Sequence, residues 1–256
     1  MFKEFIWMLR YPIRSGISPS RIIRYIVDRF KLWKRFWESY FNYKRLNKLE
    51  ANSFNRQDLL QSIYPCLGED TNDTEIEPTY FYQDAWAFER IIQHKPFSHI
   101  DVGSHHKFVA LLSKVLPVTM IDIRPLSLPL DSLNFKQGSI LDLPFEDESV
   151  ESLSSLCVVE HIGLGRYGDP LDLQGSQKAI AELKRVIKPN GNLYISVPIE
   201  ERSKTYFNAH RSFNEDYIFE LFAPFKVVDS KYICGNKFTD KPALGFCIAC
   251  YHMQNL

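Results

Sequence analysis

Polar residues that suit the binding of a nucleoside stand at the ends of two apolar segments. The first segment ends in Asp101-Val102-Gly103-Ser104, and the second ends about twenty residues later in Met120-Ile121-Asp122. A glycine just past a strand lets the backbone turn sharply beneath a ligand, and a carboxylate at the tip of the next strand can accept hydrogen bonds from both ribose hydroxyls. The spacing therefore predicts a βαβ unit that holds an adenosine, and chemistry that depends on a cofactor.

The segments that follow indicate which cofactor this is. Gly138-Ser139-Ile140-Leu141-Asp142-Leu143-Pro144-Phe145 precedes a predicted strand, Glu160-His161-Ile162 follows that strand, and Lys188-Pro189-Asn190-Gly191 comes before the next one. In this order the motifs resemble those of the class I S-adenosylmethionine-dependent methyltransferases, over roughly residues 98–197. The resemblance implies a Rossmann-like fold and S-adenosylmethionine as the cofactor.

Two further segments narrow the resemblance. Residues 163–170 (Gly-Leu-Gly-Arg-Tyr-Gly-Asp-Pro) and 207–211 (Phe-Asn-Ala-His-Arg) are similar to an uncharacterised branch of methyltransferase-like proteins associated with surface-polysaccharide genes. This similarity implies an acceptor that is a glycan, a nucleotide-sugar or a lipid-linked sugar.

The resemblance assigns cofactor binding to six residues: Asp101, Gly103, Ser104, Asp122, Ser139 and Ile140. Asp122 takes the ribose position, with an ordinary strand-end turn residue as the alternative. Ser139 stands where the family often has an acidic residue for the adenine amino group, and the alternative is that it is an ordinary loop serine. The chain departs from the family at His105 and Lys107, where glycines are usual, so either these side chains point away from the cofactor or its affinity is weakened.

Two loops are expected to face each other across the transferred methyl group. Residues 160–169 and 201–213 leave the carboxyl ends of predicted parallel strands, where ligands bind in this class of fold. Removing a proton from an alcohol needs a base with a pKa near neutrality, so we predict His161 as the base, His210 as the second candidate and Glu160 as an assisting carboxylate. A purely structural role is the alternative for His161.

Five residues of the same loops are predicted to bind the acceptor: Arg166, Tyr167, Asp169, Asn208 and Arg211. The two arginines could clamp a phosphate or a carboxylate. The alternative is that they brace the loops through salt bridges with Asp169 or Glu215.

The hydrophobic pattern predicts the elements that position these residues. It indicates a doubly wound, mostly parallel sheet of seven strands in which the last strand is antiparallel, as the resemblance implies. The expected strands are residues 97–102, 118–123, 134–137, 150–157, 192–197, 226–232 and 245–253. The expected helices are residues 80–93, 105–115, 175–187 and 214–222.

The amino-terminal part of the chain has a different character. We predict a helical extension over 1–50, a linker or cap over 51–79, and a catalytic domain over 80–256. The extension contains a short first helix and a longer one from about Pro19 to Leu49, and twelve Lys/Arg against three Asp/Glu occur in its first 48 residues. In the longer helix an apolar stripe runs along one side: Ile22, Ile26, Phe30, Trp33 and Trp37.

This extension has three interpretations. The stripe with its flanking basic residues suits an anionic membrane surface, which predicts peripheral attachment at the inner face. Alternatively, it packs on the catalytic domain or on a second subunit. Binding to RNA is the third interpretation, and it is disfavoured because the rest of the chain is acidic.

Composition sets limits on compartment and metal chemistry. The five cysteines form an odd, scattered set, which predicts no disulfide framework and a reducing compartment. Cys247 and Cys250 form a CxxC pair on a predicted strand, where residues three apart face opposite sides, so we predict buried cysteines and no metal site. No apolar run is long enough for a membrane span or a signal peptide, and we predict a cytoplasmic protein.

The predicted activity is therefore O-methylation with S-adenosylmethionine as the donor. A non-catalytic module of the same fold, tethered through its basic helix, is the alternative, because two of the expected glycines are missing. A nicotinamide oxidoreductase is third, because Gly103-Ser104-His105-His106-Lys107 lacks the glycines that a pyrophosphate needs.

Overall fold

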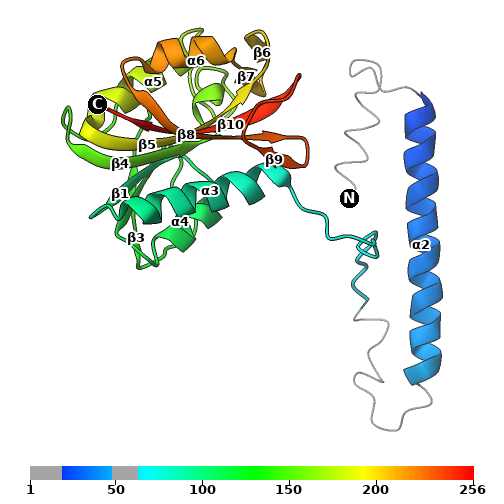
Figure 1. Cartoon of the computed structure of the whole chain (residues 1–256). Helices are drawn as coiled ribbons and strands as arrows, with labels where there is room; N and C mark the ends of the chain where they lie inside the picture. The colour runs from blue at the N-terminus through cyan, green and yellow to red at the C-terminus, as the bar shows by residue number, and fades with distance from the viewer. Residues whose placement is uncertain (1–18, 48–62) are drawn as a thin grey trace. The chain divides into compact units, whose positions relative to one another are not determined.

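The computed structural model describes residues 19–47 and 63–256, and it divides the chain into two compact units, residues 1–75 and 76–256 (Figure 1). In the first unit, α2 (Pro19–Asn47) agrees with the predicted long helix to within two residues. Residues 63–77 form neither helix nor strand. The predicted short first helix and the linker residues 51–62 lie outside the described residues.

The second unit is built on a mixed sheet of eight strands. In spatial order these are β3 (Leu133–Gln137), β2 (Val118–Asp122), β1 (His99–Val102), β4 (Val150–Leu156), β5 (Ile187–Ile199), β10 (Cys247–Gln254), β8 (Lys226–Cys234) and β9 (Lys237–Thr239). Pairing is parallel from β3 to β5, and β10 is antiparallel to both β5 and β8. The predicted doubly wound fold with an antiparallel last strand is confirmed.

The predicted number of seven strands is wrong. The eighth strand, β9, pairs with the end of β8 through a two-residue loop, Gly235-Asn236, with Cys234 opposite Lys237. A three-residue strand is too short to show the alternation by which strands are recognised in a sequence. The same reason explains why β6 (Lys204–Tyr206) and β7 (His210–Ser212), which form a separate two-stranded sheet, were not predicted.

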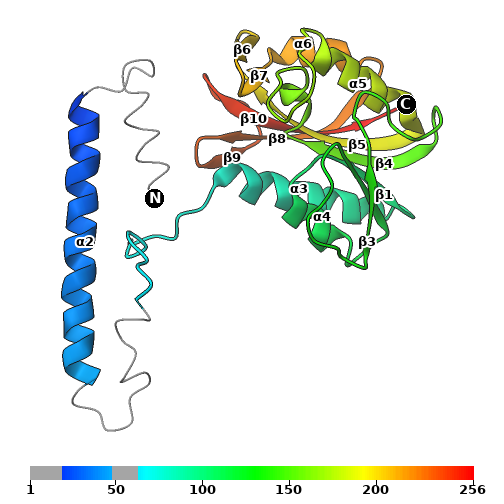
Figure 2. The same ribbon diagram turned by 180° about the vertical axis from the view of Figure 1, so that it is seen from behind.

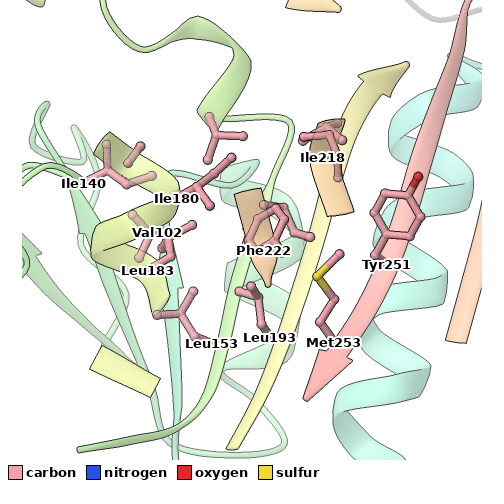
Figure 3. Close-up of a cluster of buried hydrophobic side chains, with 14 of the residues drawn as sticks. Val102, Ile140, Leu153, Ile180, Leu183, Leu193, Ile218, Phe222, Tyr251 and Met253 are labelled. Carbon is pink, nitrogen blue, oxygen red and sulfur yellow. The ribbon is translucent and has the colours of Figure 1, made fainter. Parts of the chain in front are cut away.

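Helices cover both faces of the large sheet (Figures 1 and 2). One face packs against α5 (Gly175–Val186) and α6 (Glu215–Phe222), and the other against α3 (Pro78–His94) and α4 (His106–Leu112). Figure 3 shows the core on the α5–α6 face, where Leu183 and Phe222 meet Leu153 and Leu193 of the central strands. Because β5 is buried on both sides, Leu193 belongs to this core and Tyr194 to the other.

The two cysteines of the CxxC pair lie on opposite faces of the sheet, as predicted. Cys247 belongs to the core on the α5–α6 face and Cys250 to the core on the α3–α4 face. Cys250 is a buried free thiol, and burial raises its pKa. In the described part of the chain, no group of three or more His, Cys, Asp or Glu side chains is placed to hold a metal ion.

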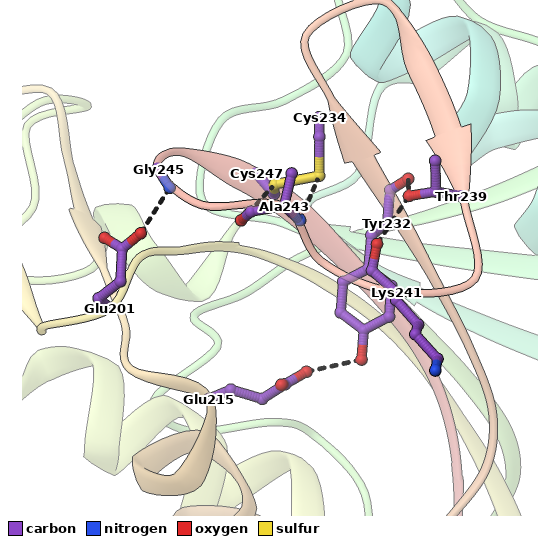
Figure 4. The surroundings of a disulfide bond; sticks show 9 residues. All are labelled: Glu201, Glu215, Tyr232, Cys234, Thr239, Lys241, Ala243, Gly245 and Cys247. Atoms are coloured by element: carbon purple, nitrogen blue, oxygen red, sulfur yellow. Dashed lines mark hydrogen bonds between the residues drawn. A yellow bond between two sulfur atoms is a disulfide. The ribbon is translucent and has the colours of Figure 1, made fainter.

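The expectation of no disulfide is wrong, because Cys234 and Cys247 are bonded, with their Cα atoms 4.4 Å apart (Figure 4). The register of β8 and β10 places Ile233 opposite Ile248, so the cysteines next to them also meet across the strands. This pairing depends on a register that cysteine spacing does not reveal. The reducing compartment was predicted because no disulfide was expected, so the number and spacing of the cysteines no longer support it. Separately, no helix in the described residues has the length and hydropathy needed to span a membrane.

Candidate functional site

Two cavities adjoin at the carboxyl edge of the parallel strands. The larger has a volume of about 880 Å³ and reaches from α4 to the loops after β2, β4 and β5, and the smaller has a volume of about 90 Å³. Six residues border both: Gly103, Asp122, Arg124, Cys157, His161 and Tyr167. The predicted first loop, ribose carboxylate and catalytic base therefore gather at one place.

The turn after β1 is shaped by buried hydrogen bonds. One carboxylate oxygen of Asp101 accepts from the backbone N–H of Ser104 at 3.1 Å, and the other accepts from the Ser154 hydroxyl at 2.6 Å. Burial raises the pKa of Asp101 to about 6. Asp101 is fully buried and borders neither cavity, so the predicted direct contact with a cofactor is corrected to a positioning role.

Gly103 occupies the floor of the site. Its φ of +73° lies in the left-handed region, and a Cβ atom built on it would lie 3.0 Å from Cγ1 of Val158. The next residue, Ser104, borders the larger cavity while its hydroxyl accepts from the backbone N–H of Leu156 at 2.9 Å. This segment thus brings backbone close to the cavity, as the sequence predicts.

Asp122 ends β2 and is half-buried between the two cavities. Its Oδ1 accepts from the backbone N–H of Arg124 at 2.8 Å. The guanidinium of Arg124 lies 4.4 Å from the ring centre of Tyr167, so a cation–π contact joins the loop after β2 to the loop after β4. One carboxylate oxygen of Asp122 thus holds the turn, and the other has no such bond to the protein.

The smaller cavity has mainly apolar walls. They include Val102, Ile121, Ile140 and Val158, and Ile140 is almost fully buried. Ser139 borders neither cavity, and its hydroxyl accepts from the backbone N–H of Leu141 at 3.1 Å. A flat apolar ring fits the smaller cavity, but the structure places Ser139, the predicted acceptor for the adenine amino group, outside its walls.

His161 has a defined tautomer. It lies at the end of a short 3₁₀ helix, η1 (Val159–His161), and its Nδ1 is 2.7 Å from the carbonyl oxygen of Ala209. Because a carbonyl oxygen only accepts, this shorter contact assigns the proton to Nδ1 and leaves Nε2 unprotonated, and Nη1 of Arg166, 3.2 Å from Nδ1, donates to the same carbonyl oxygen instead. Burial, with a smaller effect from the nearby Arg166, lowers the pKa of His161 to about 4, below the near-neutral value expected of the base, so the ring is neutral at neutral pH.

The second histidine candidate also borders the larger cavity. His210 opens β7, and its ring lies 5.6 Å from that of Phe246. Its Nε2 has no hydrogen-bond partner within residues 19–47 and 63–256. Burial lowers its pKa as well. The structure therefore brings both predicted histidines to the same cavity.

The predicted acceptor-binding residues divide into two groups. Arg166 and Tyr167 border the larger cavity. Asp169 instead accepts from the backbone N–H groups of Gly163 and Tyr167, at 2.7 and 3.2 Å, and shapes its own loop. Asn208 is exposed in the turn between β6 and β7 and borders neither cavity.

Arg211 is buried and holds the loop after β4 in place. It donates to the carbonyl oxygens of Ile162 and Asp172, at 2.5 and 2.9 Å, and to the hydroxyl of Ser176 at 3.0 Å. The predicted clamp on a substrate anion is therefore corrected to a brace. The predicted alternative, a salt bridge with Asp169 or Glu215, is corrected too, because the partners are mainly backbone carbonyls.

Several residues at the larger cavity were not predicted: Tyr80, Arg124, Cys157, Phe246 and Ile248. Phe246 and Ile248 flank Cys247 at the start of β10, so the disulfide fixes the chain next to both. No local signal marks Tyr80, which reaches the site from α3 and lies 4.7 Å from the ring of His105. Of the two residues at usual glycine positions, His105 borders the larger cavity, whereas Lys107 is exposed and borders neither cavity.

Comparisons with known proteins extend this picture. Residues 145–237 match the family described as "Caenorhabditis protein of unknown function, DUF268". No match was found among curated proteins. Many solved structures share the fold.

Three of these structures illustrate the likeness. A putative sarcosine dimethylglycine methyltransferase from Galdieria sulphuraria has a TM-score of 0.51 at 14% identity, covering 68% of this chain and 86% of that one. The 1,6-didemethyltoxoflavin-N1-methyltransferase of Burkholderia thailandensis, solved with S-adenosylhomocysteine, has a TM-score of 0.50 at 17% identity, covering 68% and 78%. The [4+2]-cyclase SpnF has a TM-score of 0.50 at 13% identity, covering 67% and 80%. The TM-scores show a common fold. At these identities the fold does not assign an activity, which has to be argued from the site.

Proposed function

We propose that this protein is an S-adenosylmethionine-dependent methyltransferase. The observation that carries the proposal is the placement of Gly103, Asp122 and His161 around two adjoining cavities at the carboxyl edge of the sheet. In doubly wound folds this edge is where ligands bind. This placement supports the roles proposed for them: a backbone turn at Gly103, a carboxylate for the ribose at Asp122 and a base at His161.

The residues present fit the cofactor. Gly103 has the positive φ that lets the backbone turn sharply beside both cavities, and the oxygen of Asp122 that does not bond to Arg124 can accept from ribose hydroxyls. The apolar cavity beside Ile140 suits an adenine ring. His105 borders the larger cavity. Its buried Nδ1 has no hydrogen-bond partner among the described residues, so it can bond to a polar group of a ligand.

Methyl transfer asks the protein mainly for position and for a place to put a proton. When bound, S-adenosylmethionine supplies a methyl group on a positively charged sulfur. His161 is oriented by its bond to Ala209, and its free Nε2 can accept a proton from an acceptor hydroxyl. Arg166, which donates to the same carbonyl at 2.9 Å, keeps this loop contact in place.

For the acceptor we propose a hydroxyl of a glycan, a nucleotide-sugar or a lipid-linked sugar. The polar part of the larger cavity, with Arg166, Tyr167 and His210, supports a hydroxyl-bearing ligand. Asn208, exposed on the β6–β7 turn, is proposed to contact the outer part of such an acceptor. The sugar class itself rests on the sequence resemblance.

Transfer of a labelled methyl group tests the proposal. The protein is incubated with methyl-labelled S-adenosylmethionine and with nucleotide-sugar, lipid-linked and polysaccharide fractions. Label in a base-stable product of one fraction supports an O-methyltransferase. Cofactor binding without transfer to any fraction supports the non-catalytic module instead.

We further propose that α2 attaches the protein to an anionic membrane surface. Its apolar side chains are exposed, with Phe30 at 78% and Phe41 at 60%, and basic residues such as Lys31 and Lys34 accompany them. Exposed aromatics beside basic residues suit the boundary between headgroups and acyl chains. Each basic residue near such a surface contributes about 1 kcal/mol.

The attachment is tested by flotation of the full chain with liposomes rich in phosphatidylserine. Flotation is expected to weaken steeply with salt, because exposed charges are screened beyond about 10 Å at 0.1 M. It should be lost in the double variant Phe30→Ser/Phe41→Ser but kept in Leu173→Ser/Leu244→Ser, which changes two exposed residues of the other unit. If the intact protein ignores the liposomes and removal of residues 1–50 changes its oligomeric state, α2 is a packing surface.

A further inference from the structure

Glu160 is a buried carboxyl group without a charged partner. It lies on η1 and borders the larger cavity, and only 2% of its side chain is exposed. Among the residues that the structure describes, its Oε2 atom has no hydrogen-bond partner. Its Oε1 atom lies 3.7 Å from Nε2 of His161, which is too long for a hydrogen bond.

The groups around Glu160 do not supply a close positive charge. The thiol of Cys157 is neutral, since burial raises its pKa well above the usual value, and His161 is neutral because burial lowers its pKa to about 4. Arg166 acts only from a distance, and its guanidinium is bonded to Ala209. Burial raises the pKa of Glu160 to about 8, so this group is a neutral acid at neutral pH.

We propose that Glu160 recognises the positive charge of the cofactor: it holds a proton while the cavity lacks a cation, and releases that proton when the cationic cofactor binds. This inference rests on the proposed function and specifies how the same site selects its donor. Burying a cation beside a neutral acid would leave it without a counter-charge, whereas a carboxylate provides one. Exchange of the proton for the cation leaves the net charge of the cavity unchanged.

The same group can then receive the proton of the reaction. The acceptor's O–H bond breaks and an O–H bond forms on Glu160, while the C–S bond breaks with its electron pair left on sulfur and a C–O bond forms. Nε2 of His161 is 3.7 Å from Oε1 of Glu160, so a small side-chain movement would let it pass to Glu160 a proton taken from an acceptor hydroxyl. Glu160 is the better final holder, because its pKa of about 8 exceeds that of His161, about 4.

The pH dependence of proton release follows from the protonated carboxyl group of Glu160 in the free protein. At pH 7 the free protein holds the proton on Glu160, so binding of a cation must release it. Above pH 8 the carboxyl group is already ionised, and binding releases no proton from it. S-adenosylhomocysteine lacks the sulfonium charge, so it should release little or none at either pH.

Titration calorimetry of the full chain, in phosphate and in Tris at pH 7 and pH 9, tests the proposal by counting protons. S-adenosylmethionine without acceptor is expected to release close to one proton at pH 7 and almost none at pH 9, and S-adenosylhomocysteine almost none at either. In Glu160→Gln the release should disappear, and affinity for S-adenosylmethionine should fall about tenfold or more relative to S-adenosylhomocysteine. The control Glu220→Gln, which removes an exposed carboxyl group of α6, should behave as the wild type.

Equal proton release by the two ligands at pH 7, or full release in Glu160→Gln, would overturn this inference and leave the methyltransferase proposal standing. Failure of both ligands to bind would overturn both. If Glu160→Gln does not fold, the comparison of the two ligands at pH 7 and pH 9 in the wild type still decides.

Discussion

Replacing His161 with alanine is expected to reduce methyl transfer about a hundredfold or more while the affinity for S-adenosylhomocysteine stays nearly constant. The loss of a general base affects the chemical step, whereas the residues proposed to bind the cofactor, Gly103 and Asp122, are unchanged. His161 suits the role because its Nε2 is unprotonated and the residue borders both cavities. The measurement is the turnover of labelled methyl groups together with calorimetric affinity.

Two further variants make this result interpretable. His161→Gln keeps a donor for the carbonyl oxygen of Ala209 but cannot act as a base, so it should lose activity while keeping the fold. His94→Ala, which changes an exposed histidine at the end of α3, should remain active. Turnover that persists in folded His161 variants would move the role to His210, whose Nε2 is also free.

Asp122→Ala is expected to weaken the binding of S-adenosylhomocysteine by about 1.5 to 3 kcal/mol, which is the usual value of hydrogen bonds to a charged group. This corresponds to a loss of roughly ten- to 150-fold in affinity. The reason is that the oxygen of Asp122 not bonded to Arg124 is available to ribose hydroxyls. Calorimetric titration of the variant measures the effect directly.

Asp122→Asn separates the charge from the turn. An amide oxygen can still accept from the backbone N–H of Arg124, so the loop after β2 should keep its shape while the ionic part of the ribose contact is lost. Asp216→Ala removes an exposed acidic residue of α6 and serves as the control. Unchanged affinity in a folded Asp122→Ala protein would show that this carboxylate does not bind the cofactor.

Much of the fold could be predicted because its central elements carry strong local patterns. β5 is buried on both faces and therefore appears as a continuous apolar run, and α5 repeats its apolar residues at helical spacing. β9 could not be predicted, because three residues are too few for any period. The Cys234–Cys247 bond depends on strand register, which is settled only when β8 and β10 pair.

In the candidate site, too, some features could be predicted from the sequence and others could not. Gly103, Asp122 and His161 could be placed together because each follows a parallel strand, and those strand ends meet at one edge of the sheet. The brace formed by Arg211 could not be predicted, since its partners Ile162 and Asp172 lie far away in the sequence. Asp101 was assigned to the ligand because local sequence does not show that Ser154 bonds to its carboxylate from a neighbouring strand.

The most direct test of the proposed cofactor site is calorimetric titration of the full chain with S-adenosylhomocysteine. The proposal predicts saturable binding of one ligand per chain, displaced by S-adenosylmethionine. Absence of binding in folded protein, or binding of NADH in place of S-adenosylhomocysteine, would contradict it.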